Sequence, residues 1–138
     1  MYAAILDRYS AAWNRRDVDA ILAFHTEDSV FENHTSGGKA VGKAELRQLL
    51  EDVFATFPDL RFAARRVYFG EGVAVLEWTA HATHTQPVKR GARIFPPTGK
   101  QLSWDGMDVL PFRGQLIARK DVYADSISFL EQLGASLA

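Results

Sequence analysis

Two aspartates, Asp108 and Asp121, are the residues of this sequence best suited to acid–base chemistry. Each falls in the middle of an expected β-strand, where aspartate is uncommon. A short turn at Arg113-Gly114 would make the two strands neighbours, and the alternation of side chains then places both carboxyls on one face. Two carboxyls that share an apolar pocket would raise the pKa of at least one of them. Such a pair can supply an acid and a base near neutral pH.

The same aspartates also have ordinary structural explanations. Asp121 could form an ion pair with Arg119, Lys120 or Arg66 on an exposed face of the sheet, because surface ion pairs are common. Asp108 could face solvent or a partner subunit. The spacing of the residues leaves these alternatives open.

The alternation of side chains between the two faces of each strand also indicates which residues could line a pocket for an apolar ligand. Aromatic residues on a half-buried sheet are equally compatible with an ordinary core. Asn33 could hold a substrate oxygen or a water, or could make a turn hydrogen bond before Thr35. The expected substrate-binding residues are Phe31, Asn33, Trp78, Trp104, Leu110, Phe112, Arg119 and Tyr123.

The histidines do not follow a metal-binding pattern. His81 and His84 are three residues apart on an expected strand and therefore point to opposite faces. His25 and His34 fall in different elements, without an H-E-x-x-H motif. The sequence has no cysteine, P-loop or dinucleotide-binding fingerprint. We therefore expect neither a metal ion nor a cofactor.

Composition narrows the class of protein. A chain of 138 residues fits a single domain, expected over residues 1–138. The formal net charge of −1 argues against nucleic-acid binding. No apolar run is long enough to span a bilayer, and residues 1–15 do not resemble a signal peptide. We expect a cytoplasmic protein.

The basic stretch 89–93 could steer an acidic substrate, although such stretches are usually solvated loops.

The periodicity of apolar residues predicts the elements that must position these side chains. Helical spacing appears in residues 2–13, after Asp17, in residues 43–57 and after Asp125, and both aspartates are suitable N-caps. Alternating patterns predict strands at residues 29–34, 60–69, 73–84, 102–112 and 116–123. We expect an α+β fold with a cone-shaped, curved antiparallel sheet wrapped over about three N-terminal helices, plus a short C-terminal helix. The open end of such a cone forms a pocket.

Several segments resemble the SnoaL-like polyketide cyclases, within the nuclear-transport-factor-like superfamily. They extend over nearly the whole chain and follow the family's order: Ala12-Trp13-Asn14, Phe95-Pro96-Pro97-Thr98-Gly99-Lys100, Gly106-Met107-Asp108-Val109-Leu110 and Gly114-Gln115-Leu116-Ile117.

This resemblance implies an intramolecular aldol ring closure in which an aspartate on the last strand acts as acid and base. Counted forward from Gly114, that position is Asp121. A histidine on the preceding strand corresponds to Asp108 when counted from Pro96, and to Met107 when counted back from Gly114.

The resemblance also implies a homodimer that pairs through the outer face of the sheet. The contact residues expected from parity are Arg65, Val67, Met107 and Val109.

Related branches of the superfamily suggest other reactions. Limonene-epoxide hydrolases use an Asp-Arg-Asp set with Tyr and Asn. Here Asp121 and Asn33 match this set. The tyrosine position corresponds to Phe31, and the arginine and second aspartate positions correspond to Trp78 and Ala80. Ketosteroid isomerases use a neutral aspartic acid, a role open to Asp108 or Asp121.

The working hypothesis is a cofactor-independent acid–base enzyme acting on a small hydrophobic carbonyl compound, by aldol cyclisation or isomerisation. The alternatives are a non-catalytic small-molecule-binding domain and an epoxide hydrolase.

Overall fold

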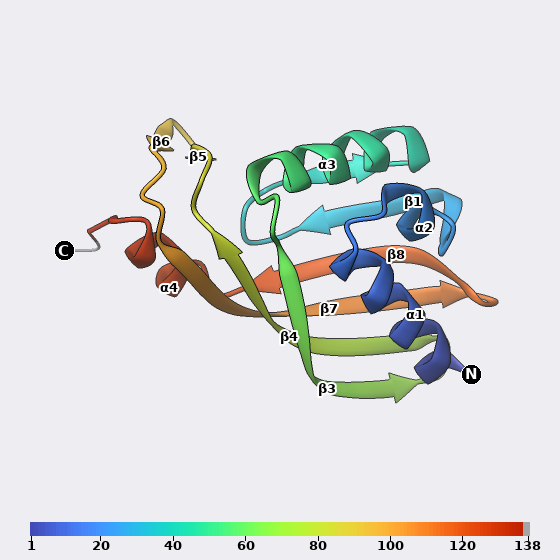
Figure 1. Cartoon of the computed structure of the whole chain (residues 1–138). Helices are drawn as coiled ribbons and strands as arrows, with labels where there is room; N and C mark the ends of the chain where they lie inside the picture. Colours follow the sequence, from blue (N-terminus) through green and yellow to red (C-terminus); the bar gives the residue numbers. More distant parts are fainter. Residues whose placement is uncertain (137–138) are drawn as a thin grey trace.

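The computed structural model describes residues 1–136 and shows an α+β fold (Figure 1). The helices are α1 (Tyr2–Asn14), α2 (Val18–Leu22), α3 (Lys43–Thr56) and α4 (Ser126–Gln132). The strands are β1 (His25–Asn33), β2 (Lys39–Val41), β3 (Arg61–Gly70), β4 (Val73–Thr83), β5 (Val88–Arg90), β6 (Arg93–Phe95), β7 (Gln101–Arg113) and β8 (Leu116–Ala124).

A curved six-stranded sheet carries the fold, with strand order β2-β1-β8-β7-β4-β3. Helices α1, α2 and α3 pack against one side of it, and the short hairpin β5–β6 stands beside α4 at one end (Figure 1). The expected cone-shaped sheet over N-terminal helices is confirmed. The sheet is mixed rather than wholly antiparallel, because β1 pairs with β8 in parallel.

The helices begin where the sequence predicts. The carboxylate of Asp17 accepts a hydrogen bond from the amide of Ala20, and that of Asp125 accepts one from Ser128. These bonds satisfy amides that the first turn of a helix leaves unpaired. Both predicted N-caps are therefore confirmed.

We expected the stretch 89–93 to be a loop, but it forms the tip of a hairpin, with residues 89–90 in β5, 91–92 in the turn and 93 in β6. Gly91 has a φ of 60°, which suits glycine at a tight turn. The hairpin brings Arg90 to the end of the sheet beside α4, a position that a solvated loop would not fix.

A bulge separates the two halves of the β7–β8 hairpin. Near the turn, Phe112 pairs with Ile117, whereas further along Val109 pairs with Asp121. Two residues of β7, Leu110 and Pro111, therefore lie opposite three residues of β8, at positions 118, 119 and 120. Proline in a strand is typical of a bulge, because it has no N–H to donate. The extra residue reverses the side-chain alternation of β8 beyond it.

Within residues 1–136, no helix combines the length and the apolar character needed to cross a bilayer.

Candidate functional site

A cavity of about 300 Å³ lies between the helices and the inner face of the sheet. This volume is at the small end of the range for ligand pockets. Most of its exposed wall is apolar, and eight of the lining residues are aromatic. The aromatic lining residues are Tyr9, Trp13, Phe31, Phe57, Phe62, Trp78, Trp104 and Phe129.

Asp108 and Lys120 form an ion pair in the wall of this cavity. The Nζ of Lys120 lies 3.5 Å from Oδ2 of Asp108, and each side chain is only 6% exposed. The other oxygen of Asp108, Oδ1, is buried without a hydrogen-bond partner among the described residues. Burial raises the pKa of Asp108, and the Lys120 ammonium and the Trp78 side chain only partly oppose this rise.

Aromatic rings surround the Lys120 ammonium on its other sides. Nζ lies 4.1 Å from the ring centre of Trp13, 5.0 Å from that of Tyr9 and 5.5 Å from that of Phe31. Ring faces attract a cation, so they offset part of the cost of burying it. Burial alone would lower the pKa of Lys120, but Asp108 and Tyr9 together raise it. The side chain is therefore a fixed positive charge in the cavity wall.

Behind Lys120, a short series of hydrogen bonds runs into the core. Lys120 donates to the Tyr9 hydroxyl at 3.3 Å, and that hydroxyl lies 2.9 Å from Nε2 of His25. Burial, together with the charges of Lys120 and Lys43, lowers the pKa of His25 to about 3. The imidazole is therefore neutral at any physiological pH.

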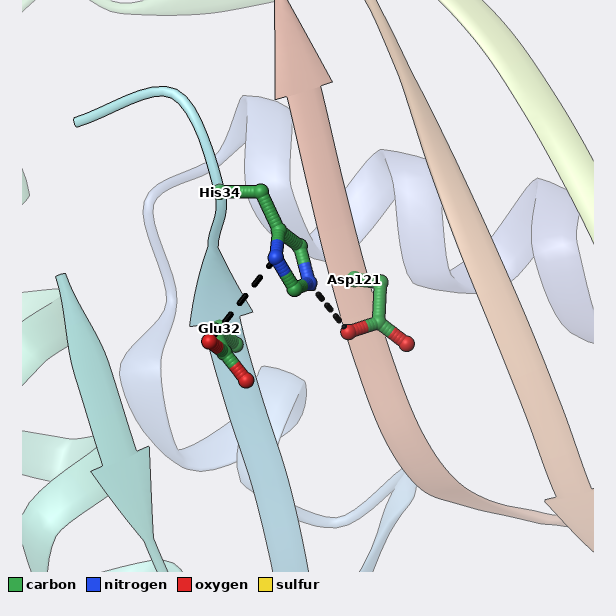
Figure 2. A group of neighbouring side chains, drawn as sticks. All are labelled: Glu32, His34 and Asp121. Atoms are coloured by element: carbon green, nitrogen blue, oxygen red, sulfur yellow. Dashed lines mark hydrogen bonds and ion pairs between the residues drawn. The ribbon is translucent and has the colours of Figure 1, made fainter. Parts of the chain in front are cut away.

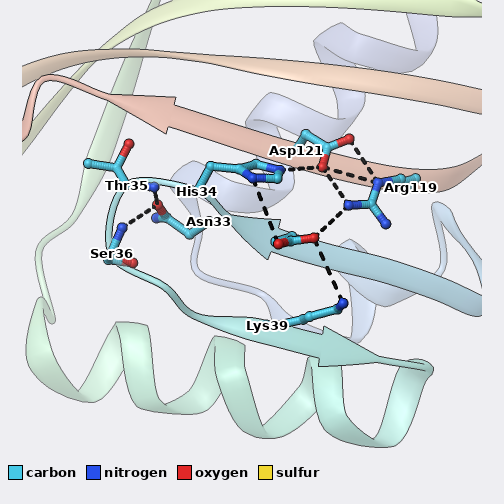
Figure 3. Close-up of polar contacts among 8 residues, drawn as sticks. Asn33, His34, Thr35, Ser36, Lys39, Arg119 and Asp121 are labelled. Atoms are coloured by element: carbon cyan, nitrogen blue, oxygen red, sulfur yellow. Dashed lines mark hydrogen bonds and ion pairs between the residues drawn. The ribbon is translucent and has the colours of Figure 1, made fainter.

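Five of the predicted site residues line the cavity: Asp108, Phe31, Asn33, Trp78 and Trp104. Asn33 also has the alternative role considered for it, because its Oδ1 accepts hydrogen bonds from the amides of Thr35 and Ser36 (Figure 3). The ring of Trp78 lies across Gly106, where a Cβ atom would overlap the indole. Glycine at position 106 therefore determines where one aromatic wall can lie.

The prediction that Asp121 faces the pocket is wrong. Asp121 lies on the opposite face of the sheet, where Arg119 donates to both of its carboxylate oxygens at 2.8 to 3.1 Å (Figure 3). His34 Nε2 lies 2.7 Å from Oδ1 of the same carboxylate (Figure 2). Burial is the largest single influence on the pKa of Asp121 and raises it, but the hydrogen bonds and charges of Arg119 and His34 together outweigh burial and lower the pKa. The ion pair with Arg119, an alternative left open by the sequence, is the observed arrangement.

Four further expected binding residues lie outside the cavity lining. Arg119 is held by Asp121 and by Glu32, at 2.7 Å from Oε1. Tyr123 stacks on His34 with ring centres 4.6 Å apart. Two inward-facing residues are also absent from the lining: Leu110 is fully buried in the core, and Phe112 stacks on Tyr2 at 4.3 Å.

Glu32, His34 and Asp121 resemble a cation site on this outer face, since their ligand atoms lie within 4.8 Å of one another (Figure 2). Arg119 already donates to both carboxylates, and Lys39 lies 3.9 Å from Glu32. A metal ion would have to displace the guanidinium from both partners. The cluster is better described as a charge network that joins β1 to β8.

The predicted outer-face contacts need one correction. Met107 pairs with Tyr123 and Val109 with Asp121, so both face outward. Arg65 forms an ion pair with Asp105, at 3.1 Å, and borders a shallow outer depression. Val67 pairs with Leu76, which lines the cavity, so Val67 belongs to the inner face. The irregular register after Ala64 causes this difference.

Sequence reasoning did not select Lys120, Tyr9, Trp13 or Arg90 for the pocket. The side chain of Arg90 lines the cavity and lies 5.0 Å above the Phe129 ring, and it has no ion-pair partner in residues 1–136. The available signal for Lys120 was Pro111, because proline within a strand indicates a bulge and hence a change of parity.

Comparison with known proteins agrees with this architecture. A family model described as a SnoaL-like domain matches residues 6–120. No curated protein sequence matches the chain significantly.

Solved structures give close matches in fold. AclR from Streptomyces galilaeus, described as a candidate hydroxylase, is 25% identical with a TM-score of 0.82, over 99% of this chain and 86% of its own. A candidate SnoaL-like polyketide cyclase from Jannaschia is 14% identical with a TM-score of 0.83, over 97% and 92%. A candidate polyketide cyclase from Acidithiobacillus ferrooxidans is 22% identical with a TM-score of 0.79, over 95% and 92%.

Proposed function

The chain belongs to the SnoaL-like domain family, and from that premise we propose that it is a cofactor-independent acid–base enzyme in which Asp108 moves a proton on a small hydrophobic carbonyl compound. The single observation that carries this proposal is the buried Asp108–Lys120 pair in the wall of a mostly apolar cavity. Asp121, which we expected as the base, takes no part in it because it faces away from the cavity.

Asp108 has the properties of a general base. Its raised pKa makes the carboxylate a stronger base than an exposed aspartate. Its unpartnered Oδ1 can accept a proton from a bound compound while Oδ2 stays close to Lys120. In the proposed reaction, Asp108 removes a proton from the carbon next to the carbonyl, and the electron pair moves onto the carbonyl oxygen to form an enolate.

Lys120 is suited to stabilise that enolate. A fixed ammonium in a mostly apolar cavity is most effective where negative charge develops during the reaction. From an unsaturated carbonyl compound the enolate is a dienolate, and it takes the proton back from Asp108 at a different carbon. Alternatively, the enolate carbon attacks a second carbonyl of the same molecule, and the alkoxide formed there takes the proton from Asp108. The first outcome is an isomerisation and the second is an aldol ring closure, and both return Asp108 to its starting state.

The walls favour a flat, apolar substrate. Trp78 and Trp104 line one side of the cavity, and Phe57 and Phe129 pack against Trp104 at 5.6 and 4.8 Å. Trp13 Nε1 is a second buried polar atom without a partner among the described residues. Buried polar atoms in folded proteins are nearly always hydrogen-bonded. A ligand with one acceptor and one acidic C–H or hydroxyl group would match Trp13 and Asp108.

Exchange of carbon-bound hydrogen tests the proton transfer without knowledge of the natural substrate. β-Tetralone is small, bicyclic and enolisable, and its hydrogen–deuterium exchange in heavy water is followed by NMR. We expect the protein to accelerate this exchange and Asp108→Asn to reduce the acceleration about 100-fold or more. Asp121→Asn is the matched control, and it should leave the rate unchanged.

Binding without catalysis is the alternative that this experiment separates. If β-tetralone binds the wild-type protein but exchanges no faster than in buffer, the domain is a small-molecule-binding module. If Asp121→Asn abolishes exchange and Asp108→Asn does not, the assignment of the base is wrong.

We further propose that the chain pairs with a second copy through the outer face of the sheet. Tyr68 and Tyr123 are 51% and 46% exposed on that face, next to the outward side chains of Val75, Val109 and Met107. Burial of this apolar surface would favour association. Sedimentation at micromolar concentration should give a dimer, and Tyr68→Glu should give a monomer. A monomeric wild-type protein would contradict the proposal.

A further inference from the structure

Behind the cavity, four side chains and one backbone carbonyl form a continuous series of hydrogen bonds. It runs from Lys120 to Tyr9 (3.3 Å), from Tyr9 to His25 Nε2 (2.9 Å), from His25 Nδ1 to Ser29 (2.9 Å), and from Ser29 to the carbonyl of Ile117 (3.1 Å). Tyr9, His25 and Ser29 are each no more than 1% exposed. The series begins and ends on β8, because it leaves from Lys120 and returns at Ile117.

The Ile117 carbonyl fixes the direction of every bond in this series. A carbonyl can only accept, so Ser29 donates its hydroxyl hydrogen to it. The Ser29 oxygen must then accept from Nδ1–H of His25. A neutral imidazole carries one N–H, so Nε2 is an acceptor and takes the hydroxyl hydrogen of Tyr9.

The consequence for Tyr9 is that its hydroxyl faces Lys120 with lone pairs alone. It can accept a hydrogen bond from an ammonium and has no hydrogen left to donate to a neutral amine. The reverse direction would require His25 to donate from Nε2, and Ser29 then to donate to His25 instead of Ile117.

We propose that Ser29 and His25 act through Tyr9 as positioning residues that keep Lys120 protonated in the cavity. This inference rests on the proposed function, since it specifies the charge state in which Lys120 would stabilise an enolate. Neither Ser29 nor His25 lines the cavity, so their effect must pass through Tyr9.

The other groups around Lys120 agree with a permanent charge. Asp108 on β7 provides a counter-charge, Trp13 on α1 and Phe31 on β1 provide ring faces, and His25 is neutral. The pKa of Lys120 is raised although burial alone would lower it, and the charge of Asp108 is the largest of the opposing causes. A neutral lysine, by contrast, could attack a carbonyl and form a Schiff base.

The titration of Lys120 tests directly whether the Tyr9–His25–Ser29 series keeps its side chain protonated. The sequence has five lysines, so their ¹³Cε resonances can be resolved and Lys120 assigned with a Lys120→Met variant. We expect Tyr9→Phe to lower the pKa of Lys120 by about one unit or more, because it removes a hydrogen bond to a charged group. Ser29→Ala should lower it in the same direction, since it frees His25 to take its other tautomer.

Two control variants distinguish this effect from a general loss of packing. Thr26→Val removes another buried hydroxyl of β1, which donates to Asp28, and should leave the pKa of Lys120 unchanged. Ser29→Thr keeps the hydroxyl and should titrate like the wild type. An unchanged Lys120 pKa in both Tyr9→Phe and Ser29→Ala would overturn the inference.

A second readout needs no titration. Borohydride added with β-tetralone should attach no mass to Lys120 in the wild type, because an ammonium forms no Schiff base. Trapped adduct on wild-type Lys120 would also overturn the inference. Neither measurement depends on turnover. The inference about Lys120 can therefore fail while the proposed role of Asp108 holds, and the role of Asp108 can fail while the inference holds.

Discussion

The ammonium of Lys120 lies 3.5 Å from the carboxylate of Asp108, and both side chains are almost completely withdrawn from solvent. Removing two charges from water costs several kcal/mol per ion, and their attraction repays this only in part. An apolar pair of similar volume would often be as stable. A pair kept at such a cost in a ligand-sized cavity is therefore expected to serve function rather than stability.

Stability measurements can test this interpretation. Lys120→Met leaves Asp108 buried without a counter-charge and should lower the free energy of unfolding by about 3 kcal/mol. The double variant Asp108→Leu/Lys120→Met should be at least as stable as the wild type and inactive in β-tetralone exchange. Urea unfolding measures both. A double variant that is less stable than either single variant would show that the pair holds the fold together.

The pH dependence of exchange should show the raised pKa of Asp108. A general base works only when deprotonated, so the rate should fall as pH decreases through that pKa. The midpoint should lie above 3.8, the ordinary value for aspartate. The midpoint should be absent in Asp108→Asn. A rate that stays constant down to the pKa of an exposed carboxyl would contradict this expectation.

The raised pKa of Asp108 also has a consequence for folding. Because the pKa is higher in the folded state, Asp108 favours folding below its unfolded-state pKa and loses this contribution as pH rises through its folded-state pKa. The advantage of the wild type over Asp108→Asn in free energy of unfolding should therefore shrink from acid toward neutral pH. Urea titrations of both proteins at several pH values provide the comparison.

Arg90 should determine whether the cavity accepts an acidic ligand. Its guanidinium lines the cavity without an ion-pair partner in residues 1–136. Arg90→Ala should weaken binding of a β-tetralone carboxylate several-fold and leave binding of β-tetralone itself unchanged. Arg93→Ala is the matched control, because Arg93 lies over Phe95 and does not line the cavity. Equal losses for both ligands would indicate that Arg90 only packs.

Gly106 should control the width of the cavity. A methyl group at this position would overlap the Trp78 ring and push it toward the ligand. We expect Gly106→Ala to lower the free energy of unfolding by about 1 to 3 kcal/mol through overpacking. We also expect it to weaken the binding of β-tetralone. Gly38→Ala is the control, since a methyl group there meets only ordinary contacts. Unchanged ligand affinity in Gly106→Ala would contradict the proposed position of the ring.

The sequence predicts the fold much better than it predicts the site. Helical spacing and the caps Asp17 and Asp125 locate the helices, and alternation locates the long strands. These signals are local, so each element can be predicted from its own residues. The short strands β2, β5 and β6 were missed because three residues carry too little periodicity.

The site depends on which residues of neighbouring strands pair. A shift of one residue in this pairing turns the side chains that follow to the other face of the sheet. Counted from the hairpin turn, Asp108 would lie opposite Asp121, whereas the bulge places it opposite Val122. Lys120 takes the inward position and Asp121 the outward one. Pro111 indicated an irregularity, but it could not show on which strand the extra residue lies. The Tyr9–His25–Ser29 series depends on contacts between α1 and β1 that no local pattern encodes.

The order of strands in the sheet also determines when the cavity can form. β8 is the last strand to be synthesised, yet it lies in the interior of the sheet, between β1 and β7. Lys120 must therefore reach Tyr9, which is 111 positions earlier in the chain, after the flanking strands already exist. A nascent chain that ends before residue 116 exposes the open edges of β1 and β7. We expect slow folding that is governed by insertion of this strand, with the earlier segments vulnerable to aggregation until it arrives.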